Sequence, residues 1–156
     1  MQKQKTTNLL LFVIGTELIG ALSGIVSGGN FKTFYNSLNQ PPFAPPGWLF
    51  PVMWAILYAT MGVSAYLVYQ SEHSRKESAL ILYFIQLFLN FLWSPVFFRF
   101  KSLTGATVVI LLLLILVILM IVRFWGIRKS AALLNIPYLL WIIFAAYLTI
   151  GFLLLN

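Results

Sequence analysis

The sequence predicts an all-α integral membrane protein in which five transmembrane helices form one bundle with a proline-rich first loop. Hydrophobic residues make up 61% of the 156-residue chain and charged residues only 8%, whereas about a quarter of the residues of a soluble domain are charged. Apolar windows of about 20 residues, long enough to cross the ~30 Å hydrocarbon core of a bilayer, recur along the chain. These windows lack alternating polarity, so we expect helices rather than barrel strands.

The five helices are expected at residues 9–28, 49–70, 79–98, 104–124 and 131–154. One domain then spans residues 1–156 and leaves no room for a soluble module. A cleaved signal peptide over residues 1–28 is the weaker interpretation, because the apolar run exceeds the usual hydrophobic region and contains Glu17. The absence of cysteine excludes disulfides, thiol catalysis and cysteine metal sites.

The net charge of +7 indicates membrane topology rather than a nucleic-acid partner, because the basic residues lie at predicted helix ends. With the N-terminus inside, one group faces the inner side of the membrane: Lys3, Lys5, Arg75, Lys76, Arg123, Arg128 and Lys129. The other group faces outward: Lys32, Arg99 and Lys101. This asymmetry fits the positive-inside rule, and it leads us to expect contacts with headgroups of the lipid bilayer. The first loop, residues 29–48, then lies outside.

Residues 41–51 read Pro-Pro-Phe-Ala-Pro-Pro-Gly-Trp-Leu-Phe-Pro. Proline lacks the amide proton and clashes with the preceding turn, so this segment cannot continue a helix. A plain linker would be polar and rich in serine and glycine. A stiff aromatic loop between two apolar runs is expected to cover a binding site as a lid.

The first helix has a face of small residues, on which Gly20, Gly24 and Gly28 follow helical spacing together with Glu17. Glycines four residues apart allow close approach of another helix, so the simpler interpretation is helix packing. Glu17 is expected inside the bundle, because an ionisable group at membrane depth usually faces a polar interior. Contact of Glu17 with a ligand and contact with a neighbouring helix both stay open.

Polar and aromatic residues form similar stripes on three other helices. The members are Trp54, Tyr58, Met61 and Ala65 on the second helix, Gln86, Asn90, Trp93 and Phe97 on the third, and Tyr138, Trp141, Ala145 and Thr149 on the fifth. Side-chain amides in an otherwise apolar helix should point inward. Trp48 and Trp125 fit interfacial anchors, whereas the three stripes together favour a large, flat, aromatic-lined pocket.

Four segments carry motifs of a known family. They are the proline-rich run 38–48, residues 54–58 (Trp-Ala-Ile-Leu-Tyr), residues 86–95 with Asn-x-x-Trp-Ser-Pro, and residues 137–148 with Pro-Tyr-Leu-Leu-Trp. In this order, and over nearly the whole chain, they resemble the TspO/translocator protein family. These are the tryptophan-rich sensory proteins, whose animal members are the peripheral benzodiazepine receptors.

The resemblance implies a five-helix bundle, a homodimer, and a pocket near the first loop. The implied ligands are porphyrins (protoporphyrin IX and haem), sterols, and isoquinoline or benzodiazepine-type drugs. Carried onto matching positions, the pocket would contain Tyr35, Trp54, Asn90, Trp93, Trp141 and Ala145. The implied function is that of a membrane receptor or sensor tied to tetrapyrrole and oxidative-stress regulation.

Two alternatives to the receptor function stay open. Some bacterial relatives are described as degrading protoporphyrin with light and oxygen; Trp54 and Trp141 would then be the catalytic residues, with porphyrin as substrate. Transport of a tetrapyrrole or sterol is disfavoured, because the chain shows no internal repeat. Phe34 departs from the family, since many relatives have tryptophan there, and that departure could weaken photochemistry.

No conventional catalytic set can be assembled from these residues. The only histidine, His73, falls in a short polar turn, so we expect no metal site, no required cofactor, and porphyrin binding through the ring rather than through iron. Aromatic stacking is worth about 0.5–1.5 kcal/mol per pair beyond area burial. Lys32 or loop amides could reach the propionates. A bacterial cytoplasmic membrane is the expected location, with the mitochondrial outer membrane as the alternative.

Overall fold

The structure is a computed structural model that describes residues 2–29 and 31–156. Its elements in chain order are α1 (Gln2–Ser27), α2 (Phe31–Ser37), α3 (Leu49–Tyr69), α4 (Lys76–Ser94), η1 (Pro95–Arg99), α5 (Leu103–Trp125), α6 (Lys129–Leu134) and α7 (Ile136–Leu155). Five segments are long and apolar enough to cross a membrane: Lys3–Ser27, Leu49–Tyr69, Lys76–Arg99, Leu103–Trp125 and Lys129–Leu155. The predicted all-α bundle of five spanning helices is therefore confirmed, and the chain is a multi-pass integral membrane protein.

Two helix starts lie earlier than predicted. The first spanning segment begins at Lys3 instead of residue 9, and the third begins at Lys76 instead of residue 79. Hydropathy marks only the apolar part of a helix, whereas its polar end turns extend into the headgroup region. The other bounds differ from the prediction by at most two residues, within the usual uncertainty of helix ends.

Two features of the backbone were not predicted. The first loop contains the short helix α2, and the fifth spanning segment is broken at Asn135 into α6 and α7. Pro137 lies in the first turn of α7, where proline is well tolerated because its missing N–H needs no partner there. The buried Asn135 side chain stabilises the break, since its Nδ2 donates to Ser64 Oγ at 2.5 Å and to the Ala131 carbonyl at 3.0 Å.

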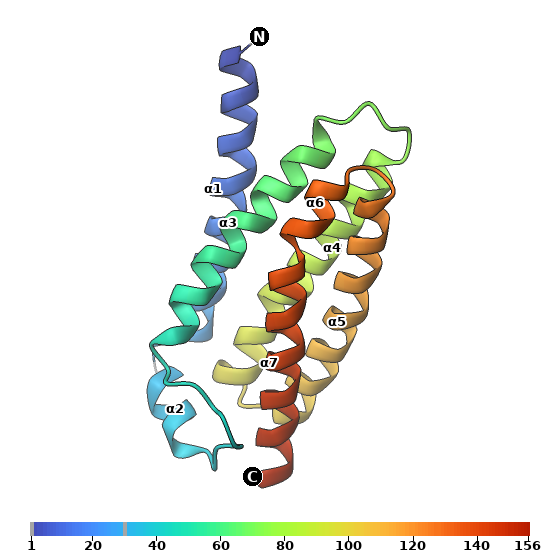
Figure 1. Cartoon of the computed structure of the whole chain (residues 1–156). Coiled ribbons are helices and arrows are strands. Elements are labelled where there is room, and N and C mark those ends of the chain that lie inside the picture. The colour runs from blue at the N-terminus through green and yellow to red at the C-terminus, as the bar shows by residue number, and fades with distance from the viewer. Residues whose placement is uncertain (1, 30) are drawn as a thin grey trace.

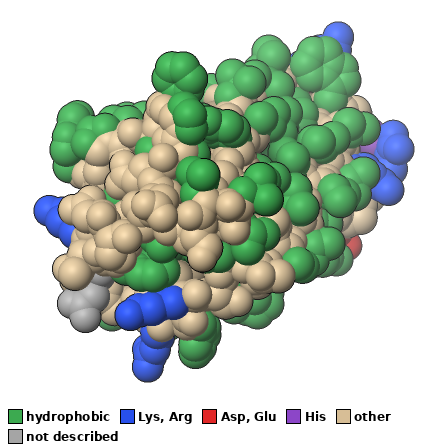
Figure 2. All heavy atoms as spheres, turned by 90° about the horizontal axis from the view of Figure 1, so that it is seen from below, with side chains coloured by type: hydrophobic (Ala, Val, Ile, Leu, Met, Phe, Trp, Pro, Cys, Tyr) green, Lys and Arg blue, Asp and Glu red, His purple; other side chains and the backbone are tan. Residues whose placement is uncertain are grey.

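The helices form a ring in which α1 contacts α3 and α4, and α5 packs against both α4 and α7 (Figure 1). The N-terminal end of α1, the α3–α4 turn and the α5–α6 turn lie at one end of the bundle, while α2 and the C-terminus lie at the other. The two predicted groups of basic residues therefore separate to opposite ends. Figure 2, seen from the α2 end, shows hydrophobic side chains over much of the visible outline, with Lys and Arg side chains at its margin.

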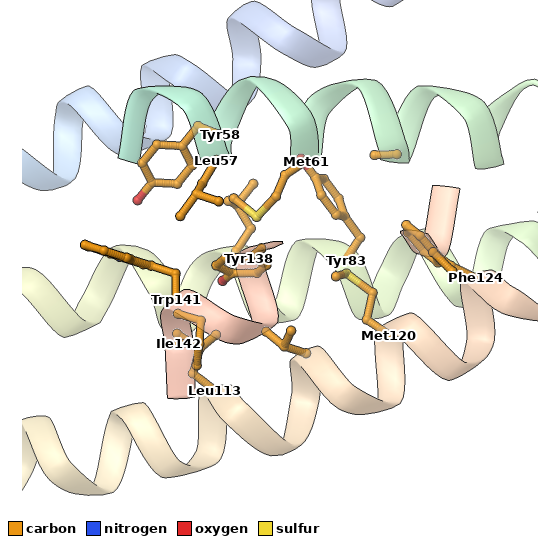
Figure 3. Packing of buried hydrophobic residues seen from close by; sticks show 14 of the residues in the cluster. Leu57, Tyr58, Met61, Tyr83, Leu113, Met120, Phe124, Tyr138, Trp141 and Ile142 are labelled. Atoms are coloured by element: carbon orange, nitrogen blue, oxygen red, sulfur yellow. The ribbon is translucent and has the colours of Figure 1, made fainter. Parts of the chain in front are cut away.

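The core is formed by the inward faces of α3, α4, α5 and α7. Tyr83, Tyr138, Met61 and Met120 are at most 1% exposed, and they interdigitate between the helices (Figure 3). The outward faces carry large exposed apolar side chains instead, such as Leu11, which is 66% exposed. A chain with apolar residues both inside and outside matches a bundle surrounded by lipid.

The proline-rich loop is fixed onto the C-terminal end of α7. Asn39 and Asn156 bond reciprocally, with Asn39 N donating to Asn156 Oδ1 at 2.8 Å and Asn156 Nδ2 donating to the Asn39 carbonyl at 3.1 Å. Tyr147 Oη donates to the Pro42 carbonyl at 2.8 Å, and Pro41 packs on Gly151 so closely that a side chain there would collide. These contacts hold the loop at the α2 end of the bundle.

Candidate functional site

A cavity of about 370 Å³ lies inside the bundle between α1, α3 and α4. Its walls are the small-residue face of α1, the first turns of α3 with Trp54 and Tyr58, and the end of α4 with Asn90 and Trp93. Phe31 at the start of α2 also lines it, so the cavity lies toward the first loop. Its volume is within the range of small-molecule sites, and its lining of aromatic residues with few polar groups is typical of them.

Five of the six residues expected to bind ligand line one of two hollows. Trp54, Asn90 and Trp93 line the main cavity. Tyr35 and Ala145 line a second, much smaller hollow of about 20 Å³, which shares Trp93 with the first. These five residues therefore line two neighbouring hollows that share the Trp93 side chain. Their role in ligand binding stays a prediction.

Trp141, the sixth residue, lies behind the cavity wall. Its ring meets Trp54 edge to face, with ring centroids 6.4 Å apart at 88°, and meets Phe50 at 5.9 Å. Phe50 also contacts Tyr35 at 5.4 Å, so it fills the space between α3 and α7. This filling explains why the main cavity is walled by α1, whereas we expected a pocket among the second, third and fifth spanning segments.

A buried chain of hydrogen bonds fixes the inner wall of the cavity. Tyr58 Oη donates to Asn90 Oδ1 at 2.6 Å, and Asn90 Nδ2 donates to Tyr138 Oη at 2.8 Å. Tyr138 Oη in turn donates to Gln86 Oε1 at 2.8 Å. The chain links α3, α4 and α7, and Figure 3 shows its two tyrosines reaching into the core from α3 and α7. These bonds hold the wall together across three helices, while Gln86 Nε2 is buried without a partner among the described residues.

The two indoles on the cavity wall are each held by a stacked ring. Trp54 stacks on Tyr58 with centroids 5.3 Å apart at 26°, and Trp93 stacks on Phe97 at 5.1 Å and 23°. Stacked aromatic pairs are favourable and restrict ring orientation. The cavity therefore presents preformed aromatic walls, which would bind a flat ligand without first becoming ordered.

The three glycines on one face of α1 have different structural surroundings. Gly20 packs directly against the Tyr58 ring, where any Cβ would collide. A Cβ at Gly24 would meet no atom within 4 Å, and Gly24 lines the cavity instead. Gly28 follows the end of α1 with φ of +87°, a conformation that glycine adopts at helix ends without strain. Within this chain, close packing is therefore seen at Gly20, and a packing role of Gly24 and Gly28 stays a prediction.

Comparison with known proteins identifies the chain. A model of the TspO/MBR family matches residues 12–155. The chain belongs to the TspO/MBR family. It is 33% identical over 152 residues to "Protein CrtK" of Rhodobacter capsulatus, covering 96% of this chain and 93% of the relative. It is 35% identical over 148 residues to "Tryptophan-rich protein TspO" of Archaeoglobus fulgidus, covering 95% and 96%. It is 32% identical over 142 residues to "Translocator protein" of Sus scrofa, covering 86% and 84%.

Membership confirms the resemblance found in the sequence motifs. The relatives carry names of tryptophan-rich, sensory and translocator proteins, and membership in this TspO family supports a role as a membrane sensor or receptor. The cavity lies where the family motifs meet, because Trp54 belongs to one motif and Asn90 and Trp93 to the next. Residues of two separate motifs therefore line the same cavity.

Sequence reasoning missed the polar part of the TspO-family cavity. Ser23 Oγ donates to the Phe91 carbonyl at 2.8 Å, and Ser27 Oγ donates to Ser94 Oγ at 2.8 Å. All three serines line the cavity and join α1 to the end of α4. Their four-residue spacing on α1, beside the glycines, was a usable signal. Glu17 lies half-buried on the same wall, so it faces the cavity.

Tyr35 serves as an anchor for the first loop. It is only 3% exposed, and its Oη donates to the Pro45 carbonyl at 2.7 Å. Burial raises the pKa of its phenol above the ordinary value of 10, because the phenolate would lose its hydration. The neutral, donating form therefore holds the loop at all pH values below 10, and the contact weakens only as pH rises above its pKa.

Metal chemistry finds no support in residues 2–29 and 31–156, which hold no group of three or more His, Cys, Asp or Glu side chains placed to bind an ion. His73 lies in the α3–α4 turn, at the end of the bundle away from the cavity. The groups that face the cavity are indoles, a phenol, a side-chain amide, hydroxyls and one carboxyl. Such a lining can stack, donate and accept hydrogen bonds.

Proposed function

We propose that this TspO-family protein is a membrane sensor that binds a porphyrin, such as protoporphyrin IX or haem, in the cavity between α1, α3 and α4. The observation that carries the proposal is the pair of indoles, Trp54 and Trp93, held on the walls of one cavity of about 370 Å³. A porphyrin offers a wide π surface, and aromatic walls match it by stacking. Occupancy of the cavity would then report on the tetrapyrrole level of the cell.

The polar groups support the same occupant. Asn90 and the serines of α1 can bond ring nitrogens or substituents, while Lys32, next to the cavity residue Phe31, is exposed and can reach propionates at the membrane surface. No iron ligand is required for this arrangement, so porphyrins with and without iron would both bind. Porphyrin is the ligand here, and no further cofactor takes part.

Other parts of the proposal concern partners and location. Isoquinoline and benzodiazepine-type drugs are flat, aromatic and apolar, so we expect them to compete with porphyrin for this cavity. A homodimer is expected from the family. The asymmetry of basic residues supports an N-terminus on the inner side, and we propose the bacterial cytoplasmic membrane as the location.

Replacing Trp54 with phenylalanine is expected to weaken porphyrin binding about 2- to 12-fold, the equivalent of one stacking contact of about 0.5–1.5 kcal/mol. The measurement is a titration of purified protein with protoporphyrin IX in the dark, followed by the absorption of the pigment. Trp125→Phe is the matched control, because Trp125 is 49% exposed at the opposite end of the bundle. Equal dissociation constants for the two variants, or unsaturable binding, would show that the pigment partitions into the micelle.

Light-dependent degradation of the porphyrin is the second candidate function. The observation that favours it is the contact of Trp54 on the wall with Trp141 behind it, because an oxidised indole would have a second indole beside it as an electron donor. The excited pigment and dioxygen supply the oxidising chemistry. Phe34, which stands where many relatives have tryptophan, packs against Phe97 with ring centroids 5.8 Å apart. It lines neither the main cavity nor the smaller hollow, so this departure from the family does not alter the cavity wall.

The degradation candidate predicts that pigment absorption decays under light and air and stays constant in the dark or under argon. Trp54→Phe should abolish the decay, and Trp141→Phe should slow it. Trp125→Phe again serves as the control and should leave the rate unchanged. Decay at the same rate without protein would remove this candidate while leaving porphyrin binding intact.

A further inference from the structure

A third hollow, of about 370 Å³, lies at the opposite end of the bundle from the porphyrin cavity. It opens between the first turns of α1, the α3–α4 turn and the α5–α6 turn, where α1 and α3 diverge (Figure 1). Every side chain that lines it is polar: Gln4, Lys5, Asn8, Gln70, Glu72 and Arg128.

The charged groups of this hollow come from three separate elements and remain unpaired. Lys5 lies on α1, Glu72 in the α3–α4 turn and Arg128 in the α5–α6 turn. Among the residues that the structure describes, no hydrogen bond or ion pair engages the side chain of any of the three. The absence of pairing leaves these groups available to an occupant.

Two other cations at the same end have partners within the protein. Lys76 Nζ donates to the Tyr69 and Ser71 carbonyls at 3.3 and 3.0 Å, and Lys129 Nζ lies 5.6 Å from the centre of the Trp125 ring. The side chains of Lys5 and Arg128 have no such partner, although both line the same hollow as Glu72.

The position of the hollow identifies the kind of occupant. The spanning segments Lys3–Ser27 and Leu49–Tyr69 start and end at its rim, so it lies at the depth of lipid headgroups. Two cations would bind a phosphate through charge-assisted hydrogen bonds. Glu72 would repel a headgroup that carries only negative charge, and it would accept hydrogen bonds from an ammonium group.

We propose that this hollow is a binding site for a phosphoethanolamine headgroup, supplied by a membrane phospholipid. The phosphate lies between Lys5 and Arg128, the ammonium donates to Glu72, and the side-chain amides of Gln4, Asn8 and Gln70 complete the hydrogen bonds. A choline headgroup carries the same charges but has no N–H to donate. The site therefore distinguishes ethanolamine lipids both from glycerol lipids and from choline lipids.

Native mass spectrometry of the full chain in detergent tests this, with an equimolar mixture of phosphatidylethanolamine, phosphatidylglycerol and phosphatidylcholine of identical acyl chains. The wild-type protein should retain mainly the ethanolamine lipid. Arg128→Gln should lower its retention about fivefold, the equivalent of about 1 kcal/mol for one cation near the membrane surface. Glu72→Gln should leave total retention similar but shift the preference toward phosphatidylglycerol.

Arg75→Gln is the matched control, because it removes a cation from the same turn as Glu72 without touching the hollow. Thermal unfolding of each variant shows that it is folded. An equal loss of lipid in Arg75→Gln and Arg128→Gln would overturn the site in favour of diffuse charge attraction, as would an unchanged headgroup preference in Glu72→Gln. Displacement of the lipid by millimolar soluble phosphoethanolamine or inorganic phosphate would overturn the lipid as the source of the headgroup; retention under both supports it.

Discussion

Replacing Asn90 with leucine is expected to lower the free energy of unfolding by about 1–3 kcal/mol and to weaken porphyrin binding. Leucine has a similar size but removes both hydrogen bonds of the Asn90 side chain, so Tyr58 Oη loses its acceptor and Tyr138 Oη loses a donor. Each buried polar group left unpaired costs about 1–3 kcal/mol. Interhelical hydrogen bonds in membranes measure about 0.6 kcal/mol on average, which puts the expected value in the lower half of the range. Thermal unfolding in detergent, followed by circular dichroism, gives the stability change.

Two neighbouring variants separate the hydrogen-bond chain from the cavity. Tyr83→Phe removes the 2.6 Å bond to Thr16 Oγ1, and Tyr83 does not line the cavity, so stability should fall while porphyrin affinity stays unchanged. Gln86→Met removes one accepted hydrogen bond together with a buried Nε2 that has no partner among the described residues. Its loss of stability should therefore be smaller than that of Asn90→Leu. A loss in Gln86→Met as large as in Asn90→Leu would contradict the ranking.

The inward-pointing amides were the part of the site that sequence could predict well. Gln86 and Asn90 lie in a helix made mostly of apolar residues, so membrane physics alone places them inside the bundle. The structure adds their partners, Tyr58 and Tyr138, which come from two other helices. Hydropathy predicts the direction of a polar group, whereas the choice of partner depends on how the helices pack.

The location of the cavity could not be predicted in the same way. Gly20 and Gly24 share one face of α1 and have the same size, yet Gly20 touches Tyr58 and Gly24 faces open space. The difference depends on how closely α3 approaches each turn of α1, which the sequence of α1 alone does not specify. Likewise, Phe50 lies next to the proline-rich loop in sequence, and nothing in that position indicates that its ring fills the space between α3 and α7.

The helix break at Asn135 was partly predictable from the sequence. Pro137 was a visible signal that a helix begins near residue 136, since proline is favoured in the first turn. The apolar run nevertheless continues through α6, and it led to one long predicted helix over residues 131–154. The buried bonds from Asn135 to Ser64 and Ala131 show what holds the break. In this chain the asparagine two residues before the proline marks the break, whereas hydropathy does not.

The largest backbone effect is expected at Gly62, a buried residue of α3 that no sequence pattern singled out. A Cβ at this position would lie 2.7 Å from Val13 Cα and 2.9 Å from the Phe12 carbonyl oxygen. These are backbone atoms of α1, which cannot rotate aside as a side chain would. Gly62→Ala therefore forces α1 away from α3 and should lower the free energy of unfolding by about 1–3 kcal/mol, the usual range for overpacking.

Gly24→Ala is the matched control, with the opposite expected sign. It introduces the same methyl group into a helix where nothing lies within 4 Å, and alanine is the better helix former by up to about 1 kcal/mol. The chain has no cysteine, so spin labels attached at Leu11→Cys and Ile56→Cys, both exposed positions on α1 and α3, report the spacing of the two helices directly. The distance should increase in Gly62→Ala and stay constant in Gly24→Ala. Because the cavity lies between these same helices, a wider spacing should also weaken porphyrin binding; unchanged spacing with lost stability would show that the strain is absorbed elsewhere.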